Sequence, residues 1–525
     1  MLPKTLFLYD TTLRDGAQTE GISFSLEDKI RIARVLDELG VHFIEAGWPS
    51  NTKDRKVFEI LKKNPLSFSQ LVAFGSTHRV NKTVLTDENI KRLLQAQTKV
   101  ITIFGKSWDL HVKDVLKVSL DENLRIIEAS IKYLVSNKRE VFFDAEHFFD
   151  AYKSNRDYAL KTLEVAAASG AKLLVLCDTN GGTVTSQLRE IIKEVSSKIN
   201  APLGIHTHND LGLAVANSIV AIENGCSQAQ GTINGLGERC GNADLCSVIA
   251  IAKLKLRINC ISEAQLKKLT EVSRYICEVA NIIQPNNLPF VGHSAFAHKG
   301  GVHIDAMTKN PKTYEHIDPE AVGNSRKILV SELAGKTPLV IKAKELEFDL
   351  EKKSPEAEKL LKLLQDLEHK GYQFEAADGS FALLLQKAFK RHSKFFELES
   401  FRVIIEKKQS GKLVSEATIK LKVNKAIEHT TAEGDGPINA LDNALRKSLK
   451  GFYPTLSKMR LSDFKVRVLD AKSGTAAKVR VLIQSQDEEA SWGTVGVSEN
   501  IIEASWQALM DSVEYKLSKD AKSNQ

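Results

Sequence analysis

The first half of the chain alternates short apolar runs with longer stretches whose apolar residues recur at helical spacing. Between the first two runs, SLEDKIRIARVLDELG puts its apolar residues on one helix face, and Ser25 can cap this helix while Gly40 can end it. The stretch RDYALKTLEVAAASG, which ends at Gly170, follows the same pattern. The eight apolar runs predict β-strands at residues 6–10, 42–47, 71–75, 100–104, 141–145, 172–177, 203–207 and 228–233.

Strands that alternate with helices are typical of parallel βαβ units and of an α/β fold. Eight such units within about 240 residues match the TIM (β/α)8 barrel in number and length. The alternative is a doubly wound open sheet, which more often has a G-x-G-x-x-G turn after its first strand, and the sequence has no such turn there. We therefore predict a TIM barrel over residues 1–277.

The pattern changes after residue 277. Residues 278–395 contain Pro- and Gly-rich segments and charged helical stretches, which predicts helical linker subdomains. From residue 396 strict alternation returns, with Ile419, Leu421 and Val423 on one face of a strand and lysines on the other. Helical patterns follow at residues 437–449 and 500–517. Residues 396–525 are therefore predicted to form a separate α/β domain.

Composition excludes several classes of protein. Hydrophobic residues make up 42% of the 525 residues, and we find no apolar run long enough for a membrane span and no secretory signal. The six cysteines form no C-x-x-C pair, which favours a reducing, cytoplasmic location. The net charge of +7 is spread along the chain, and the basic stretch at 389–396 is more typical of a solvated face than of a nucleic-acid site. We expect neither a membrane nor a nucleic-acid partner.

Polar side chains follow six of the eight predicted strands. In a TIM barrel the carboxyl ends of the strands carry the functional groups, so these side chains are expected to meet at one mouth. They come from the segments DTTLRDG, HFIEAG, DAEHFFD, CDTNGG, HTHND and NGLGERCGN. The residues concerned are Arg14, Asp15, Glu45, Glu146, Asp178, Thr179, Asn180, His206, His208, Asn209, Asp210, Glu238, Arg239 and Asn242.

His206 and His208 are the strongest indication of chemistry. Side chains two apart on a strand face the same side, so both imidazoles point to the barrel axis. Two neutral imidazoles suit a divalent metal such as zinc or manganese, and Asp15 and Asn242 could complete the set. A pair of hydrogen-bonded core histidines is the alternative. Arg14 could stabilise negative charge on a substrate oxygen, or it could form a local salt bridge with Asp15.

The segments DTTLRDG, HTHND and NGLGERCGN, in this order, resemble the metal-dependent acyl-CoA condensing barrels. That family includes isopropylmalate, homocitrate and citramalate synthases, and hydroxymethylglutaryl-CoA lyase is a relative. The segments FGKSWDLHV, FDAEHFFDAYKSN, CDTNGG and HKGGVHIDAM resemble the citramalate synthase branch most closely. The similarity covers nearly the whole chain.

The resemblance implies a role for individual residues. The family's metal ligands correspond to Asp15, His206, His208 and Asn242, for a divalent ion such as Zn, Mn or Mg. Its oxyanion-holding arginine corresponds to Arg14, its active-site glutamate to Glu146 and its keto-acid carboxylate binder to Thr179. A histidine and a tyrosine that relatives take from the partner subunit correspond to His303 and Tyr314, which implies a homodimer. The C-terminal domain resembles a regulatory domain, with isoleucine as the implied effector; a purely structural dimerisation domain is the alternative.

The implied reaction condenses acetyl-CoA with pyruvate to give citramalate and CoA, the first step of a threonine-independent route to isoleucine. Two alternatives stay open: a 2-isopropylmalate synthase that takes 2-oxoisovalerate, and a lyase that cleaves a hydroxyacyl-CoA. A pocket for pyruvate must be filled up to its methyl group. Phe74, Phe104 and Phe143 lie near strand ends and are candidates for this filling, although the alternation allows only some of them to face inward.

Overall fold

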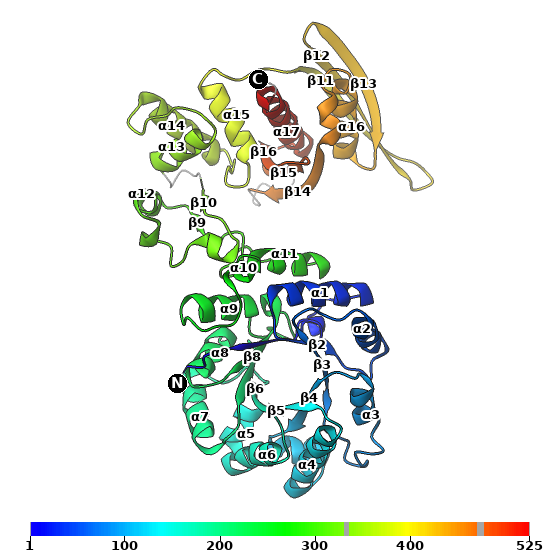
Figure 1. The fold of residues 1–525 in the computed structure, drawn as a ribbon. Coiled ribbons are helices and arrows are strands. Elements are labelled where there is room, and N and C mark those ends of the chain that lie inside the picture. The colour runs from blue at the N-terminus through cyan, green and yellow to red at the C-terminus, as the bar shows by residue number, and fades with distance from the viewer. Residues whose placement is uncertain (1, 330–334, 470–476, 524–525) are drawn as a thin grey trace. The chain divides into compact units, whose positions relative to one another are not determined.

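The computed structural model describes residues 2–329, 335–469 and 477–523 (Figure 1). The chain divides into two compact units, one comprising residues 1–296 and 316–326 and the other residues 297–315 and 327–525. The domain boundaries expected at residues 277 and 395 stay predictions. Among the described residues, no helix is both long enough and apolar enough to cross a membrane.

The first unit is a closed barrel of eight parallel strands, in which β1 pairs with both β2 and β8. This confirms the predicted TIM barrel, and each predicted apolar run overlaps one of its eight strands. Figure 1 shows the strands as an inner ring with the helices outside it. The strands are β1 (Phe7–Asp10), β2 (Phe43–Gly47), β3 (Gln70–Ser76), β4 (Val100–Lys106), β5 (Glu140–Glu146), β6 (Leu173–Asp178), β7 (Leu203–Thr207) and β8 (Gln228–Gly231).

The helices of this unit begin and end where the sequence provides caps. The Ser25 side chain accepts a hydrogen bond from the Asp28 amide at the start of α1, and Gly40 ends that helix in the left-handed region with φ of 88°. The helices are α1 (Leu26–Leu39), α2 (Thr52–Lys63), α3 (Glu88–Gln95), α4 (Leu120–Ser136), α5 (Phe148–Ser154), α6 (Arg156–Ala168), α7 (Thr185–Lys198), α8 (Ala214–Glu223), α9 (Leu245–Leu254), α10 (Glu263–Leu266) and α11 (Leu269–Val279).

Two apolar layers determine which side chains can reach the barrel mouth. An inner cluster, which contains Tyr9, Val100 and Phe142, fills the barrel interior. The outer cluster lies between strands and helices and contains Phe143, whose ring lies against Gly105. Phe143 therefore faces the helices and cannot line the barrel interior, because successive side chains on a strand face opposite sides. The inner cluster fills the barrel interior, and the polar side chains lie between this cluster and the mouth.

The second unit contains a small helical part and two antiparallel sheets. Its helical part comprises the short strands β9 (Ala297–His298) and β10 (Lys327–Ile328) and the helices α12 (Gly301–Lys309), α13 (Lys336–Glu345), α14 (Pro355–His369) and α15 (Asp378–Ala388). One sheet joins β11 (Glu397–Lys407), β12 (Leu413–Val423) and β13 (Ala426–Gly434), and the other joins β14 (Arg460–Val468), β15 (Val479–Gln486) and β16 (Ser491–Ser498). The helices α16 (Pro437–Leu449) and α17 (Ile501–Ser523) pack on these sheets.

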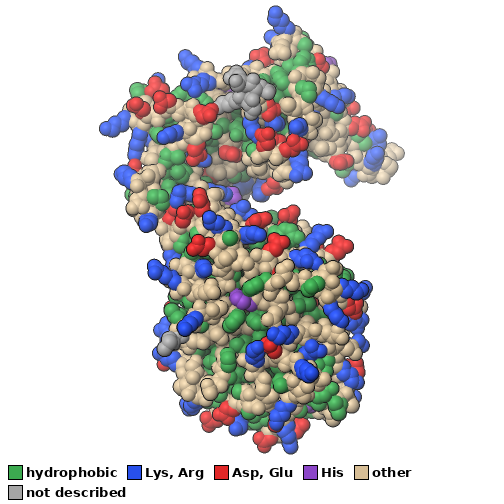
Figure 2. Space-filling model, viewed as in Figure 1, with side chains coloured by type: hydrophobic (Ala, Val, Ile, Leu, Met, Phe, Trp, Pro, Cys, Tyr) green, Lys and Arg blue, Asp and Glu red, His purple; other side chains and the backbone are tan. Residues whose placement is uncertain are grey.

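The predicted alternation in β12 is confirmed, because Ile419, Leu421 and Val423 are fully buried. Ile419 and its neighbours form one core with residues of α16 and α17. Residues 470–476 of this domain lie outside the described residues. Figure 2 shows acidic and basic side chains interspersed over the visible surface, as the spread charge of the sequence predicts.

Candidate active site at the barrel mouth

The loop after β1 is held in place by its own side chains. Asp10, which is fully buried, accepts hydrogen bonds from the backbone N of Thr12 at 2.8 Å and from the Thr12 hydroxyl at 2.9 Å. The Thr12 hydroxyl also accepts a hydrogen bond from the amide of Ile233. Burial raises the pKa of Asp10 to about 7. This turn presents Arg14 and Asp15 at the mouth of the barrel.

Arg14 bridges two carboxylates. Its Nε donates to Oε1 of Glu45 at 2.6 Å, and its Nη1 is paired with Oδ1 of Asp15. The guanidinium carbon lies 3.9 Å from the centre of the Phe74 ring. The salt bridge that the sequence left as an alternative is therefore present, and it belongs to a larger network that fixes the guanidinium plane. Tyr9 donates to Oε2 of Glu45 at 2.5 Å beneath it.

The electrostatic environment shifts the pKa values of Asp15 and Glu45 in opposite directions. Burial alone would raise the pKa of Asp15, but the charge of the adjacent Arg14 holds it below its ordinary value. Burial raises the pKa of Glu45, and the attraction of Arg14 only partly offsets this effect. Asp15 is thus kept ionised at the mouth, while the deeper carboxyl is shifted toward its neutral form.

The two histidines of the H-x-H motif lie side by side. The Nε2 atoms of His206 and His208 are 3.3 Å apart, whereas Thr207 points outward and its hydroxyl lies 2.9 Å from that of Ser218 on α8. Burial lowers the pKa of both histidines, that of His208 to about 3. Both imidazoles are therefore neutral at ordinary pH, the form that binds a metal.

A buried amide fixes the orientation of His206. Its Nδ1 lies 3.0 Å from Oε1 of Gln230, an oxygen that can only accept, so Nδ1 carries the proton and Nε2 keeps its lone pair. The Nε2 of Gln230 donates in turn to Oδ1 of Asp144 at 3.4 Å. Burial raises the pKa of Asp144 well above its ordinary value. Sequence reasoning missed Gln230 and Asp144, and the only signal was a polar residue at an inward position of β8 and of β5.

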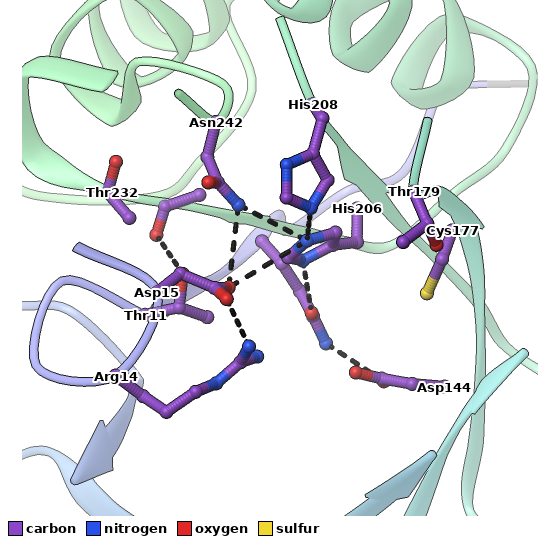
Figure 3. A network of polar contacts seen from close by, with 12 residues as sticks. Thr11, Arg14, Asp15, Asp144, Cys177, Thr179, His206, His208, Thr232 and Asn242 are labelled. Carbon is purple, nitrogen blue, oxygen red and sulfur yellow. Dashed lines mark hydrogen bonds and ion pairs between the residues drawn. The ribbon is translucent and has the colours of Figure 1, made fainter. Parts of the chain in front are cut away.

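Asn242 reaches the histidines from the loop after β8. Its Nδ2 lies 3.2 Å from Nε2 of His206 and 3.4 Å from Oδ2 of Asp15. Its Oδ1 is buried and has no hydrogen-bond partner. A Cβ atom at Gly237 would lie 1.9 Å from this oxygen, so the approach of Asn242 requires glycine there. Figure 3 shows Asp15, His206, His208 and Asn242 pointing toward one another.

These four side chains fit a metal site by their chemistry and spacing. In a tetrahedral site with bonds of about 2.0–2.1 Å, ligand atoms lie about 3.3 Å apart. Here the two imidazole Nε2 atoms are 3.3 Å apart, and Nε2 of His206 lies 3.8 Å from Oδ2 of Asp15. The side-chain amide of Asn242 approaches both groups, with its Nδ2 at 3.2 and 3.4 Å. Among the described residues, no three His, Cys, Asp or Glu side chains form a metal site by themselves. The Asn242 amide, with its unpartnered oxygen, is thus needed to complete the set.

Glu146 and Thr179 lie at the ends of neighbouring strands. Lys106, the last residue of β4, places its Nζ 2.5 Å from Oε2 of Glu146, a contact that sequence reasoning missed. The hydroxyl oxygen of Thr179 accepts a hydrogen bond from the His147 amide at 2.9 Å. Arg239 donates to the Thr179 carbonyl at 2.8 Å, and two further bonds tie Arg239 to Asp210. The loops after β6, β7 and β8 are thereby joined.

His303 and Tyr314 form a stacked pair on the second unit. Their ring centres are 4.1 Å apart, and both side chains are exposed. The structure brings these two predicted residues together with each other. Arg14, Asp15, Glu146, Thr179, His206, His208 and Asn242 belong to the barrel unit.

The chain matches known families along most of its length. Residues 5–276 match the HMGL-like family, residues 290–370 the homocitrate synthase post-HMGL domain-like family, and residues 375–517 the LeuA allosteric (dimerisation) domain. The chain therefore belongs to the HMGL-like family of TIM-barrel proteins.

The chain is also similar, along nearly its whole length, to several named enzymes. The chain is 56% identical to the (R)-citramalate synthase of Geobacter sulfurreducens, with 98% of this chain and 97% of the relative covered. It is 54% identical to the (R)-citramalate synthase of Aquifex aeolicus, with 99% of each covered. It is 32% identical to the 2-isopropylmalate synthase of Methanocaldococcus jannaschii, with 99% and 96% covered.

Proposed function

We propose that this chain is an (R)-citramalate synthase, an acyltransferase that condenses acetyl-CoA with pyruvate. Water then hydrolyses the thioester of the condensation product, which gives citramalate and CoA. The observation that carries this proposal is the set of donors around His206 at the mouth of a TIM barrel, combined with full-length similarity to such synthases at 54–56% identity. The six cysteines are all free thiols, which supports a cytoplasmic enzyme. We keep the division into a barrel (1–277), linker subdomains (278–395) and a regulatory domain (396–525).

Asp15, His206, His208 and Asn242 would hold a divalent metal ion. Rotation of the Asn242 amide about its Cβ–Cγ bond would present Oδ1 in place of Nδ2 and give the buried oxygen a partner. When bound, such an ion polarises the carbonyl group of a 2-keto acid. The neutral imidazoles supply lone pairs, and the ionised Asp15 supplies the negative charge that favours a cation.

Arg14 and Thr179 would bind the keto acid. The hydroxyl of Thr179 accepts the His147 amide and is free to donate its own proton to a substrate carboxylate. Arg14 is held rigidly by Asp15, Glu45 and the face of Phe74, so it can stabilise an alkoxide without reorganisation. These two residues would orient the substrate carbonyl for attack by the acetyl carbon.

The acetyl methyl group must lose a proton to a base. Glu146 is our candidate, because it lies at the end of β5 on the same face as Asp144, which faces the barrel interior. The stacked His303–Tyr314 pair would complete the site from the partner subunit of a homodimer. The match of residues 375–517 to a dimerisation domain supports this assembly.

An aromatic wall beside Arg14 would select pyruvate. The rings of Phe74 and Phe104 are stacked with centres 5.6 Å apart, and Trp48 packs edge-on against both. Because Arg14 lies on Phe74, this wall is next to the position of the reacting carbonyl. A filled pocket of this kind admits a methyl group and disfavours a larger side chain, by about 1–3 kcal/mol per added methylene.

The C-terminal domain would bind isoleucine as a feedback inhibitor. Residues 375–517 match an allosteric domain, which supports regulation, and the position of isoleucine as end product is implied by the citramalate route. Titration of the purified enzyme with isoleucine, monitored by calorimetry and by turnover, tests this. Absence of both heat and inhibition would leave a purely structural dimerisation domain.

A thiol-release assay for CoA tests the proposed function. The purified chain is supplied with acetyl-CoA and, in turn, pyruvate, 2-oxobutyrate and 2-oxoisovalerate, with and without a chelator. We expect pyruvate-dependent, chelator-sensitive release and citramalate as the product. Preferred release with 2-oxoisovalerate would instead identify a 2-isopropylmalate synthase, and cleavage of a hydroxyacyl-CoA without condensation would identify a lyase.

A further inference from the structure

A second ion pair lies at the barrel mouth, across the barrel from the loop after β1 that carries Arg14. Lys106 and Glu146 are register partners on the neighbouring strands β4 and β5. The ammonium nitrogen of Lys106 is 2.5 Å from Oε2 of Glu146, and each side chain is about one-fifth exposed, at 20% and 21%. The pair is thus partly shielded from water and still open to a small molecule.

The alternation of the two strands directs this pair into the barrel. On β4, the hydroxyl of Thr102 lies 2.8 Å from that of Tyr9 inside the barrel, so Lys106, four residues later, shares its face. On β5, Asp144 is bonded to Gln230, the residue that holds His206. Glu146 lies two residues further toward the mouth on the same face. Lys106 and Glu146 therefore lie one layer above the residues that support the histidines.

Arg14 and Lys106 differ in how their donors are used. Arg14 is bound to Asp15 and Glu45 and packs on Phe74. Lys106 has a carboxylate partner in Glu146, and its ammonium also lies 5.5 Å from the centre of the Phe104 ring. The contact with Glu146 is an ion pair. An ammonium group carries three donors, so this pair leaves donors for a substrate oxygen.

We propose that Lys106 is a catalytic residue that binds the thioester oxygen of acetyl-CoA and stabilises the enolate; this rests on the proposed function. Glu146 removes a proton from the acetyl methyl group, so the C–H bond breaks and the proton moves to a carboxylate oxygen. The electron pair forms a C=C bond, and the carbonyl π electrons move to the thioester oxygen. The enolate carbon then attacks the keto carbon of pyruvate, and the thioester carbonyl is restored. The π electrons of the keto group move to its oxygen, which becomes the alkoxide beside Arg14.

Proton transfer moves one negative charge from Glu146 to the enolate oxygen, and Lys106 is placed to stabilise it in both positions. Before the transfer, the negative charge lies on Glu146, within 2.5 Å of the ammonium. After the transfer, Glu146 is neutral and the charge lies on the enolate oxygen. A cation that can contact both groups keeps an ionic partner throughout, so no buried charge is left unpaired. An uncharged residue at position 106 would leave the enolate without this stabilisation.

Kinetics of three variants of the full-length enzyme test this assignment. K106M removes the charge, K106R keeps it, and K172M is the matched control. Lys172 pairs with Glu140 at 2.6 Å, and Glu140 is the first residue of β5, at the opposite end of the barrel. Turnover is measured with acetyl-CoA and with acetyl-CoA deuterated at the methyl group, together with thermal unfolding of each variant.

We expect K106M to lower kcat about 10²–10³-fold while KM for pyruvate changes less than about threefold. Its deuterium isotope effect on kcat should rise above that of the wild type, because C–H cleavage becomes rate-limiting. K106R should recover part of the loss, and K172M should match the wild type in kcat and isotope effect. A merely structural role for Lys106 would lower thermal stability without increasing the isotope effect.

Three results would overturn the assignment: a K106M enzyme with nearly wild-type kcat, a loss confined to KM for pyruvate, or a lowered kcat with an unchanged isotope effect. The second result would make Lys106 a carboxylate binder. Wild-type enzyme that releases no CoA with any keto acid would refute the proposed function itself. An active wild type with an equally active K106M would refute only the role of Lys106.

Discussion

Replacing Gln230 by leucine is expected to weaken divalent-metal binding about 10- to 100-fold, the usual effect of removing a residue that orients a metal-binding histidine. The contact removed is the 3.0 Å hydrogen bond from Nδ1 of His206, in a place where His206 is 5% exposed and Gln230 is fully buried. An unpaired buried donor costs about 1–3 kcal/mol. A 10- to 100-fold change in affinity corresponds to about 1.4–2.7 kcal/mol, so the two values agree.

The loss has a structural reason beyond the missing bond. Without an acceptor at Nδ1, His206 can place its proton on Nε2, where the lone pair for the metal should be. Competition of the purified protein with a coloured chelator for Mn²⁺ or Zn²⁺ measures the affinity directly. The matched control is Q228L, because Gln228 is also buried on β8 and accepts a hydrogen bond from Nε2 of Gln230, not from the oxygen that faces His206. Q228L should bind metal within about threefold of wild type.

Equal metal affinity of Q230L and the wild type would refute the view that Gln230 sets the tautomer of His206. Equal losses in Q230L and Q228L would attribute the effect to general loosening of the interior. Thermal unfolding of both variants separates these cases, because a folded Q230L with weakened metal binding isolates the effect at His206.

Three further predictions follow from single contacts. G237A should bind metal at least about tenfold more weakly, because its Cβ would lie 1.9 Å from Oδ1 of Asn242, whereas G182A, with open space at the same atom, should match wild type in the chelator assay. F104A should raise kcat/KM for 2-oxobutyrate relative to pyruvate about tenfold or more, measured by CoA release; an unchanged ratio would remove Phe104 from the pocket. Burial raises the pKa of Asp511 to about 6 in the native state, whereas in the unfolded state this carboxyl loses its proton near pH 4. The free energy of unfolding should therefore fall by about 3 kcal/mol as the pH rises from 4 to 6. In D511N this fall should be absent from the unfolding temperature measured across that range, and an identical pH profile for both proteins would contradict the assignment.

The barrel could be predicted from sequence because its strands are short, apolar and bounded by helical stretches. Burial on both faces makes these runs nearly continuous in hydrophobicity, and polar residues then mark the strand ends. Arg14, Asp15, His206 and His208 could be proposed for this reason, since the carboxyl ends of parallel strands meet at one mouth. The same reasoning could not supply Asn242 with certainty, because its loop folds back to pair with His208 and no periodicity predicts that bridge.

Strand register and facing account for most of what the sequence could not provide. The sequence does not distinguish Phe104 from Phe143, because both are phenylalanines near a strand end. In the structure Phe104 stacks in the barrel interior, whereas Phe143 packs between the strands and the helices. Lys106 and Glu146 meet because β4 and β5 pair in one particular register. Gln230 is a polar residue in a buried strand. Only its short distance to His206 shows that it differs from other polar side chains of the core.

Arg14 and Lys106, two of the cations at the barrel mouth, are arranged in the same way. Arg14 rests on Asp15 and Lys106 rests on Glu146, so each cation is paired with a carboxylate that the proposed chemistry engages elsewhere. Asp15 would turn toward a metal ion, and Glu146 would accept a proton. Metal binding would weaken the Arg14–Asp15 pair before the alkoxide forms beside Arg14. Protonation of Glu146 would weaken the Lys106–Glu146 pair in the same step that creates the enolate beside Lys106. Because the cations are already in place, the site stabilises both charges with little reorganisation.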